Sequence, residues 1–241
     1  AALKIQGREP MILDRATSYI GTLVDDLVTK GCSEPYRMMT SRSEYRLILR
    51  QDNAADRMVP IGHKVGLVSE ERYAKFLDEK RICEEELLRI KSVVVHPTEE
   101  VNEMLVRKGT SPITTGVRMI ELLKRPQLGY EDLAEFDPGR PKLKYSLVNK
   151  LEVEIKYSGY IRVQQEQIDK MRKLESKSLP ENIDYKTIKG LRLEAQEKLN
   201  KFKPLNVGQA GRISGVNPAD VSVLLVWMAS KEHGSRGDNN V

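Results

Sequence analysis

Four arginines and two tyrosines fall within residues 36–50 of the segment 34–57, which reads EPYRMMTSRSEYRLILRQDNAADR. The arginines are Arg37, Arg42, Arg46 and Arg50, and the tyrosines among them are Tyr36 and Tyr45. Guanidinium groups bind phosphate through two parallel donors, and aromatic rings stack on unpaired bases. The segment therefore indicates a surface that contacts nucleic acid. The alternative is an amphipathic element whose arginines are solvated or paired with acids elsewhere in the chain.

The spacing of three of these arginines suggests how they are presented. Arg42, Arg46 and Arg50 are four residues apart, so they share one face if the segment is helical. Ser41 and Glu44 have the spacing of a capping box, which would start such a helix. We therefore expect a helix that turns three cations toward one ligand.

A second basic and aromatic group lies on the longest helical pattern of the chain, at about residues 147–175. Lys156, Tyr160 and Gln164 share a face at intervals of four residues, with Tyr157 beside them. Two interpretations stay open, a face that contacts a ligand and a partly buried tyrosine face with the lysine extending into solvent.

The chain shows no recognisable catalytic constellation. Its histidines, His63, His96 and His233, are scattered without a Ser or Cys in a known arrangement. Asp25 and Asp26 are adjacent, and neighbouring helical residues point about 100° apart, so we expect charges on a helix surface rather than a shared proton.

The chain also lacks the patterns that hold metals and dinucleotides. Cys32 and Cys83 are far apart, with no Cys-x-x-Cys and no His/Cys cluster, so we expect two free thiols in a reducing cytoplasm. No G-x-G-x-x-G follows a strand, so the phosphate-binding turn of a dinucleotide domain is missing. We therefore expect no cofactor and no metal in this chain.

Composition favours a helical protein. The 241 residues are 31% charged, 39% hydrophobic and 5% aromatic, with a net charge of +5. This mild basic excess permits nucleic-acid binding without requiring it. No apolar run is long enough for a membrane, so we expect a soluble protein without a membrane partner. The fold class we predict is mainly α, with several helices, a small terminal helical bundle and little or no sheet.

Helical periodicity and caps divide the chain into four expected parts. Residues 1–66 form a connector that carries the Arg/Tyr-rich motif, 67–177 a long-helix domain, 178–232 a small helical subdomain and 233–241 a disordered tail.

Three local details carry further expectations. Ser69 and Thr98 are N-caps, and Asn217 before Pro218 is an N-cap pair. Gly159 costs its helix about 1 kcal/mol relative to alanine, which suggests close approach by another helix or a ligand. The last two helices, near 206–214 and 218–230, form a hairpin that we expect to be buried.

Several motifs resemble the C-terminal part of the glucose-inhibited division protein A family, the flavoprotein tRNA uridine 5-carboxymethylaminomethyl modification enzymes. They are GREPMILDRATSYIGTLVDDLVTKG, the Arg/Tyr-rich segment, VEIKYSGYI and NVGQAGRISGVNPADVSVLLVWM. Two positions depart from the family pattern, because Asp56 lies one residue late and Arg162 one residue early. We carry no family role over to either residue.

The resemblance implies a function for the whole protein. Family members bind FAD near their N-terminus, so we expect this chain to be a fragment of such a protein. With FAD, NADH, a methylene-folate carbon donor and a GTPase partner (MnmE), the enzyme modifies C5 of the wobble uridine of tRNA in the cytoplasm, as a homodimer. The fragment alone is expected not to be catalytic. It would bind tRNA and dock the GTPase, and the tRNA-binding residues we expect are Arg37, Arg42, Arg46, Arg50, Lys156, Tyr157 and Tyr160.

The sequence allows two other functions. One is a pure interaction module that docks the GTPase without touching RNA. The other is a helix-turn-helix DNA binder, for which the last helix lacks the necessary basic face, so we expect no DNA partner.

Overall fold

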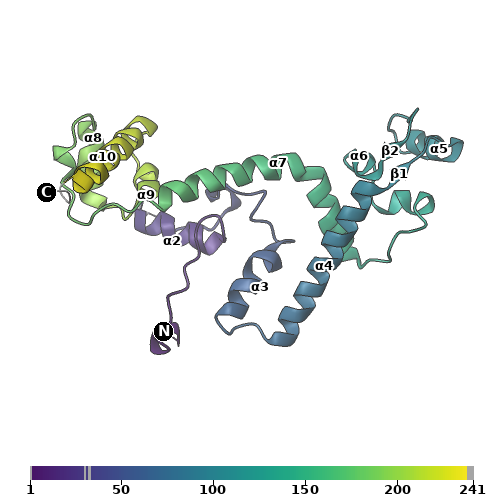
Figure 1. Cartoon of the computed structure of the whole chain (residues 1–241), viewed down its shortest axis with the longest axis horizontal. Coiled ribbons are helices and arrows are strands. Elements are labelled where there is room, and N and C mark those ends of the chain that lie inside the picture. The colour runs from purple at the N-terminus through teal and green to yellow at the C-terminus, as the bar shows by residue number, and fades with distance from the viewer. Residues whose placement is uncertain (1, 30, 32–33, 238–241) are drawn as a thin grey trace. The chain divides into compact units, whose positions relative to one another are not determined.

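A computed structural model describes residues 2–29, 31 and 34–237, with side chains as far as Lys231. The predicted fold class is confirmed, because helices dominate and the sheet consists of two strands of two residues each (Figure 1). The helices are α1 (Ala2–Ile5), α2 (Tyr19–Thr29), α3 (Ala54–Lys64), α4 (Glu70–Ser92), α5 (Glu99–Arg107), α6 (Met119–Leu123), α7 (Tyr145–Glu175), α8 (Leu193–Phe202), α9 (Val207–Arg212) and α10 (Pro218–Gly237), with short 3-10 turns η1 (Thr40–Arg42), η2 (Glu131–Phe136) and η3 (Tyr185–Thr187). No helix in the described ranges is long and apolar enough to cross a bilayer.

The chain divides into two compact units. The first unit comprises Ala1–Met11 and Leu47–Gln164, and the second comprises Ile12–Arg46 and Gln165–Val241. The division therefore falls inside α7, and the expected connector 1–66 is shared between the two units. The domain boundary predicted near residues 176–180 lies just after the end of α7, whereas the division into units lies inside α7. The predicted boundary stays a prediction.

The first unit is built around α4, with α3 beside it (Figure 1). Ser69 caps α4 by accepting a hydrogen bond from the amide of Arg72, and Thr98 caps α5 in the same way from Val101. After α4, strand β1 (Val94–Val95) pairs antiparallel with β2 (Val117–Arg118). The apolar core lies between α4, α5, α6, η2 and the start of α7, with Ile90, Leu105, Leu122, Leu128 and Leu133 almost fully buried.

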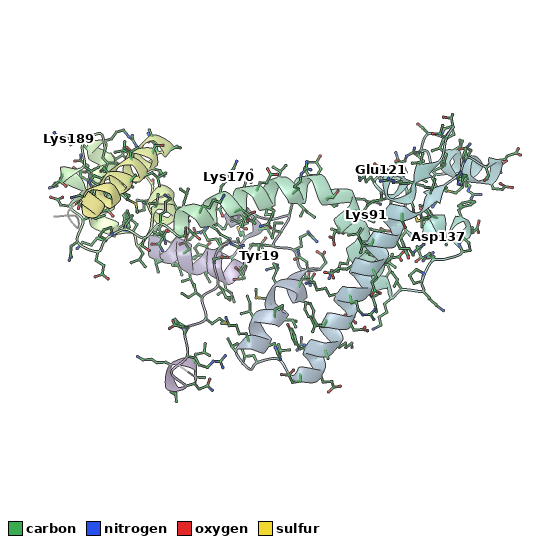
Figure 2. All side chains as sticks on the ribbon, in the orientation of Figure 1. Tyr19, Lys91, Glu121, Asp137, Lys170 and Lys189 are labelled. Carbon is green, nitrogen blue, oxygen red and sulfur yellow. The ribbon has the colours of Figure 1, made fainter. Side chains whose placement is uncertain are left out.

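One carboxylate lies within this core. Glu86 is buried, and its oxygens accept hydrogen bonds from Arg89 at 2.7 Å and from the hydroxyl of Tyr130 at 2.6 Å. Arg89 also donates to Asp137 at 2.8 Å; the side chain of Asp137 is labelled in Figure 2. Burial, followed by the hydrogen bond to Glu86, raises the pKa of Tyr130 to about 12, so the hydroxyl remains a donor at neutral pH. The buried charge is thus fully paired, as a protein interior requires.

The second unit holds a small bundle of η3, α8, α9 and α10. Its core contains Tyr185, Ile188, Leu199, Val207 and Leu224. The α9–α10 hairpin is buried only in part, because Leu224 is buried while Val226 is 70% exposed.

A reciprocal cap starts α10. The amide of Asp220 donates to the side chain of Asn217, and the amide of Asn217 donates to the carboxylate of Asp220, both at 2.9 Å. The helix is described as far as Gly237, so it includes the start of the predicted tail, while residues 238–241 lie outside the described residues.

Of the two explanations expected for Gly159, close approach by another helix is wrong, and approach by a ligand stays a prediction. A Cβ built at this position meets nothing within 4 Å, so no other part of the described chain approaches it. Close approach occurs at Gly21 of α2 instead, where a Cβ would lie 2.1 Å from the carbonyl oxygen of Asp14. The glycine that packing requires is therefore in the N-terminal segment of the second unit.

Candidate nucleic-acid interface

Arg15 is the centre of the Arg/Tyr-rich region in the second unit. Its side chain is 2% exposed and donates to residues of α2. Tyr19, the first residue of this helix, is labelled in Figure 2. The guanidinium donates to Asp26 at 2.7 Å, to Asp25 at 3.1 Å and to Glu44 at 2.7 and 2.9 Å. Burial alone would lower the pKa of Arg15, but Glu44 and Asp26 raise it above its ordinary value. A permanent cation thus joins α2 to the segment that follows it.

The expectation that Asp25 and Asp26 are surface charges is wrong. Asp26 is buried and Asp25 is half-buried, because each faces a guanidinium. Asp25 also accepts from Arg212 of α9 at 2.8 and 2.9 Å, which ties α2 to the helical bundle of the same unit. Asp26 also accepts from the hydroxyl of Tyr36 at 2.8 Å. The two carboxylates therefore organise the site.

The helix expected from residue 41 is absent. Only Thr40–Arg42 forms a 3-10 turn, its N-cap residue is Met39, and no side chain caps it. Glu44 cannot complete a capping box because its carboxylate is bound by Arg15, which lies 29 residues earlier in the chain. Residues 43–50 continue as turns and bends, so Arg42, Arg46 and Arg50 do not share a helical face.

The four arginines of the motif have different environments. Arg37, Arg42 and Arg46 are exposed, and no carboxylate in the described part of the chain pairs with them. Arg42 lies over the ring of Tyr36, with its guanidinium carbon 5.6 Å from the ring centre. Arg50 belongs to the first unit, where it is paired with Asp52 at 3.0 Å.

A pocket of about 720 Å³ opens in the second unit between the end of α2 and residues 34–44. Tyr36, Arg37, Met39 and Arg42 contribute to its wall, together with Asp26. Burial, followed by the bond to Asp26, raises the pKa of Tyr36 to about 12. The phenol therefore stays protonated and donates, and the ring is held in one place.

The residues of the second predicted group, on α7, have different environments in the structure. Tyr157 and Tyr160 are 46% and 68% exposed, so Tyr160 is mostly open to solvent while Tyr157 is partly buried, and both interpretations of this face stay predictions. Lys156 is half-buried. Gln164 does not join an open face, because its side-chain oxygen accepts from the amides of Leu47 and Ile48, both at 3.0 Å.

Some other residues named from the sequence have side-chain partners in the structure, and others are exposed, buried or outside the described residues. Asp56 pairs with Lys150 at 2.7 Å, whereas Arg162 is exposed. Cys83 is a free, buried thiol, as predicted, and burial raises its pKa. Cys32 lies outside the described residues. Arg15 was missed by the sequence reasoning, because a single arginine before α2 carries no local signal of the three carboxylates that surround it.

Comparison with known proteins shows the family to which this chain belongs. Two family models match consecutive parts of the chain, the tRNA modifying enzyme MnmG/GidA C-terminal helical domain at residues 70–165 and the MnmG/GidA C-terminal helical bundle at residues 167–240. The junction between the two matches coincides with the division between the units inside α7.

Individual relatives agree with the family models. The chain is 54% identical to the tRNA uridine 5-carboxymethylaminomethyl modification enzyme MnmG of Caldicellulosiruptor saccharolyticus and 53% identical to that of Clostridium kluyveri. These matches cover 98% and 96% of the chain but only 38% and 37% of the relatives, so the chain spans well under half of their length. The structure of Aquifex aeolicus GidA in its form II crystal is similar, with a TM-score of 0.77 and 39% identity over 94% of this chain and 35% of that one. The chain therefore belongs to the MnmG/GidA family of tRNA-modifying enzymes and corresponds to its C-terminal helical region.

Proposed function

We propose that this chain supplies tRNA contacts to an MnmG-type enzyme. The observation that carries the proposal is the group of three exposed arginines, Arg37, Arg42 and Arg46, which lack carboxylate partners in the described part of the chain. An exposed guanidinium without a partner can bind a phosphate without first breaking an ion pair. Arg50 would have to leave Asp52 to do so, and its role in tRNA binding stays a prediction.

The exposed tyrosines of α7 support a second contact with tRNA. Tyr157 and Tyr160 expose rings that are able to stack on bases, and Lys156 lies beside them with a positive charge. A Cβ at Gly159 would meet no atom of the described chain beyond its sequence neighbours within 4 Å, so the helix is open to a ligand at this position. We include Lys156, Tyr157 and Tyr160 in the proposed tRNA surface.

The activity of the whole protein enters as part of this proposal. The intact enzyme would modify C5 of the wobble uridine in the cytoplasm, as a homodimer, with FAD, NADH and the GTPase MnmE. A flavin dinucleotide site requires a glycine-rich turn between a strand and a helix of a parallel sheet. The described residues form only a short antiparallel pair, so they do not fit such a site and we assign them no flavin contact.

Salt dependence of tRNA binding tests the proposal. Each lost phosphate contact removes about 0.7 to 0.9 from the slope of log affinity against log salt. Replacing Arg37, Arg42 and Arg46 together by alanine should therefore lower the slope by about 1.4 to 2.7, the range from two phosphates, if two arginines share one, to three, and should weaken binding to all tRNAs alike. The measurement is fluorescence anisotropy of labelled tRNA between 50 and 300 mM salt (about a sixfold range, chosen for the slope).

A matched control separates local contact from net charge. Arg72, Arg107 and Arg118 are exposed residues of the first unit, and replacing them by alanine removes the same three charges. This variant should retain nearly all of the wild-type slope. An equal loss in both variants would show that only net charge matters, and an unchanged slope in the first variant would show that its arginines are not phosphate ligands.

Docking of the GTPase is a second candidate function. Helix α2 exposes an apolar stripe at helical spacing, with Ile20, Val24 and Val28 each more than half exposed. Such a stripe is typical of a helix that binds another protein. If docking is the only role, the chain should bind MnmE with little dependence on salt and should bind no tRNA.

A further inference from the structure

The pocket beside α2 offers aromatic and apolar contacts that the phosphates of a nucleic-acid backbone would not use. Arg37 and Arg42 bring two guanidinium groups with unfilled donors. Tyr36 adds an aromatic ring and Met39, which is 53% exposed, adds apolar surface. An occupant that uses all of these groups has an anionic end and a flat ring. Nucleoside phosphates have this composition.

The acidic residues that line the pocket limit the negative charge of a ligand that it can bind. Asp26 and Glu44 line it, but Arg15, which is not part of the lining, binds both and fills oxygens that would otherwise repel a phosphate. Glu34 adds another negative charge at the wall. Among the described residues of the lining, two arginines without a carboxylate partner lie beside three acids, which suits one phosphate rather than a stretch of backbone.

The aromatic wall is fixed before any ligand arrives. The hydroxyl of Tyr36 donates to Asp26 at 2.8 Å, and Asp26 is itself held by Arg15 at 2.7 Å. A ring tethered in this way loses little rotational freedom when a base stacks on it. A volume of about 720 Å³ lies within the range of small-molecule sites.

We propose that this pocket holds one unpaired nucleotide, with its phosphate on Arg37 and Arg42 and its base against Tyr36. The inference rests on the proposed tRNA function for the source of the nucleotide, an unpaired position of an RNA strand. A free nucleotide offers the same chemistry, and the test separates the two sources. Paired bases in a duplex cannot enter, because their faces are stacked within the helix.

The test compares Tyr36→Leu and Tyr36→Phe in the full chain, with Tyr145→Leu as the matched control, since Tyr145 is 84% exposed in the first unit. The probes are a single-stranded RNA octamer, its duplex and UMP. Tyr36→Leu should weaken binding of the single strand about tenfold, the effect of losing one stacked base. It should leave duplex binding and the salt slope unchanged, because no charge is removed. Tyr36→Phe retains the ring and should stay within about threefold of wild type, as should Tyr145→Leu.

Photocrosslinking of wild-type protein gives a second readout that does not depend on a variant folding. An octamer carrying 5-bromouridine should crosslink to the peptide that contains Tyr36, and crosslinks found only elsewhere would overturn the proposal. Equal weakening of single strand and duplex by Tyr36→Leu would also overturn it, as would no weakening. If wild type binds neither RNA, the tRNA function itself fails; UMP binding that depends on Tyr36 would then assign the pocket to a free nucleotide.

Discussion

The ion pairs of Arg15 allow a quantitative prediction for Arg15→Met, which removes the cation but keeps a long apolar side chain. Breaking a buried pair costs about 3–5 kcal/mol when an uncompensated charge is left behind. Of its three carboxylates, Glu44 is 49% exposed and can be hydrated again, and Asp25 keeps Arg212. Only Asp26 loses its buried partner, and it retains the hydroxyl of Tyr36. We therefore expect the lower end of the range, about 3 kcal/mol.

Urea unfolding followed by the fluorescence of Trp227 measures this cost. Trp227 is the single tryptophan of the chain and lies in α10 of the second unit, so it reports on the unit that contains Arg15. Lys170→Met, at an exposed position of the same unit, should change the free energy of unfolding by less than about 0.5 kcal/mol. Adding Asp26→Asn to Arg15→Met should recover part of the loss, because the side chain that loses Arg15 is then neutral. A cost below about 1 kcal/mol for Arg15→Met, or full additivity of the two changes, would refute the reasoning.

Three further predictions concern backbone and charge. Gly159→Ala should stabilise the chain by up to about 1 kcal/mol in urea unfolding, because the added methyl meets no atom within 4 Å and alanine favours helix. Gly21→Ala should destabilise by about 1–3 kcal/mol in the same assay, since its methyl would collide with the backbone of Asp14; equal signs for the two variants would contradict the packing. The hydrogen bond from Arg192 lowers the pKa of Asp220, so its contribution is complete above about pH 4 and is lost as pH falls through the folded-state pKa. Thermal melts from neutral to acid pH should thus show the advantage of wild type over Asp220→Asn shrinking below about pH 4, and a constant advantage would show that the pair does not titrate with folding.

The parts of the fold that the sequence predicted correctly depend on neighbours along the chain. Ser69, Thr98 and Asn217 cap their helices because a cap needs only the next three residues. The site depends on distant partners. Glu44 has the spacing of a capping residue, yet Arg15 binds it across 29 residues, and this ion pair with a buried guanidinium overrides the local preference.

The roles of the glycines also depend on residues that are distant in the chain and could not be predicted from local sequence. Gly159 and Gly21 are both helical glycines in the sequence, and nothing local distinguishes the one that contacts a loop from the one that faces open space. Gln164 was placed correctly on a helix, but its bonds to the amides of Leu47 and Ile48 depend on how the first unit closes. Side-chain roles of this kind require the tertiary structure, because the chain separation of the partners exceeds any periodic pattern.

The availability of the arginines for RNA follows from how the acids of segment 34–57 are used. Glu44 is bound by Arg15, Asp52 by Arg50 and Asp56 by Lys150, which leaves Glu34 as the acid of the segment without a partner among the described residues. Most of the negative charge that could neutralise Arg37, Arg42 and Arg46 is therefore committed to other cations. A phosphate that approaches these three arginines replaces water, whereas a phosphate at Arg50 must replace a carboxylate. One short motif thus presents three arginines that are ready to bind an anion and one, Arg50, that already binds a carboxylate.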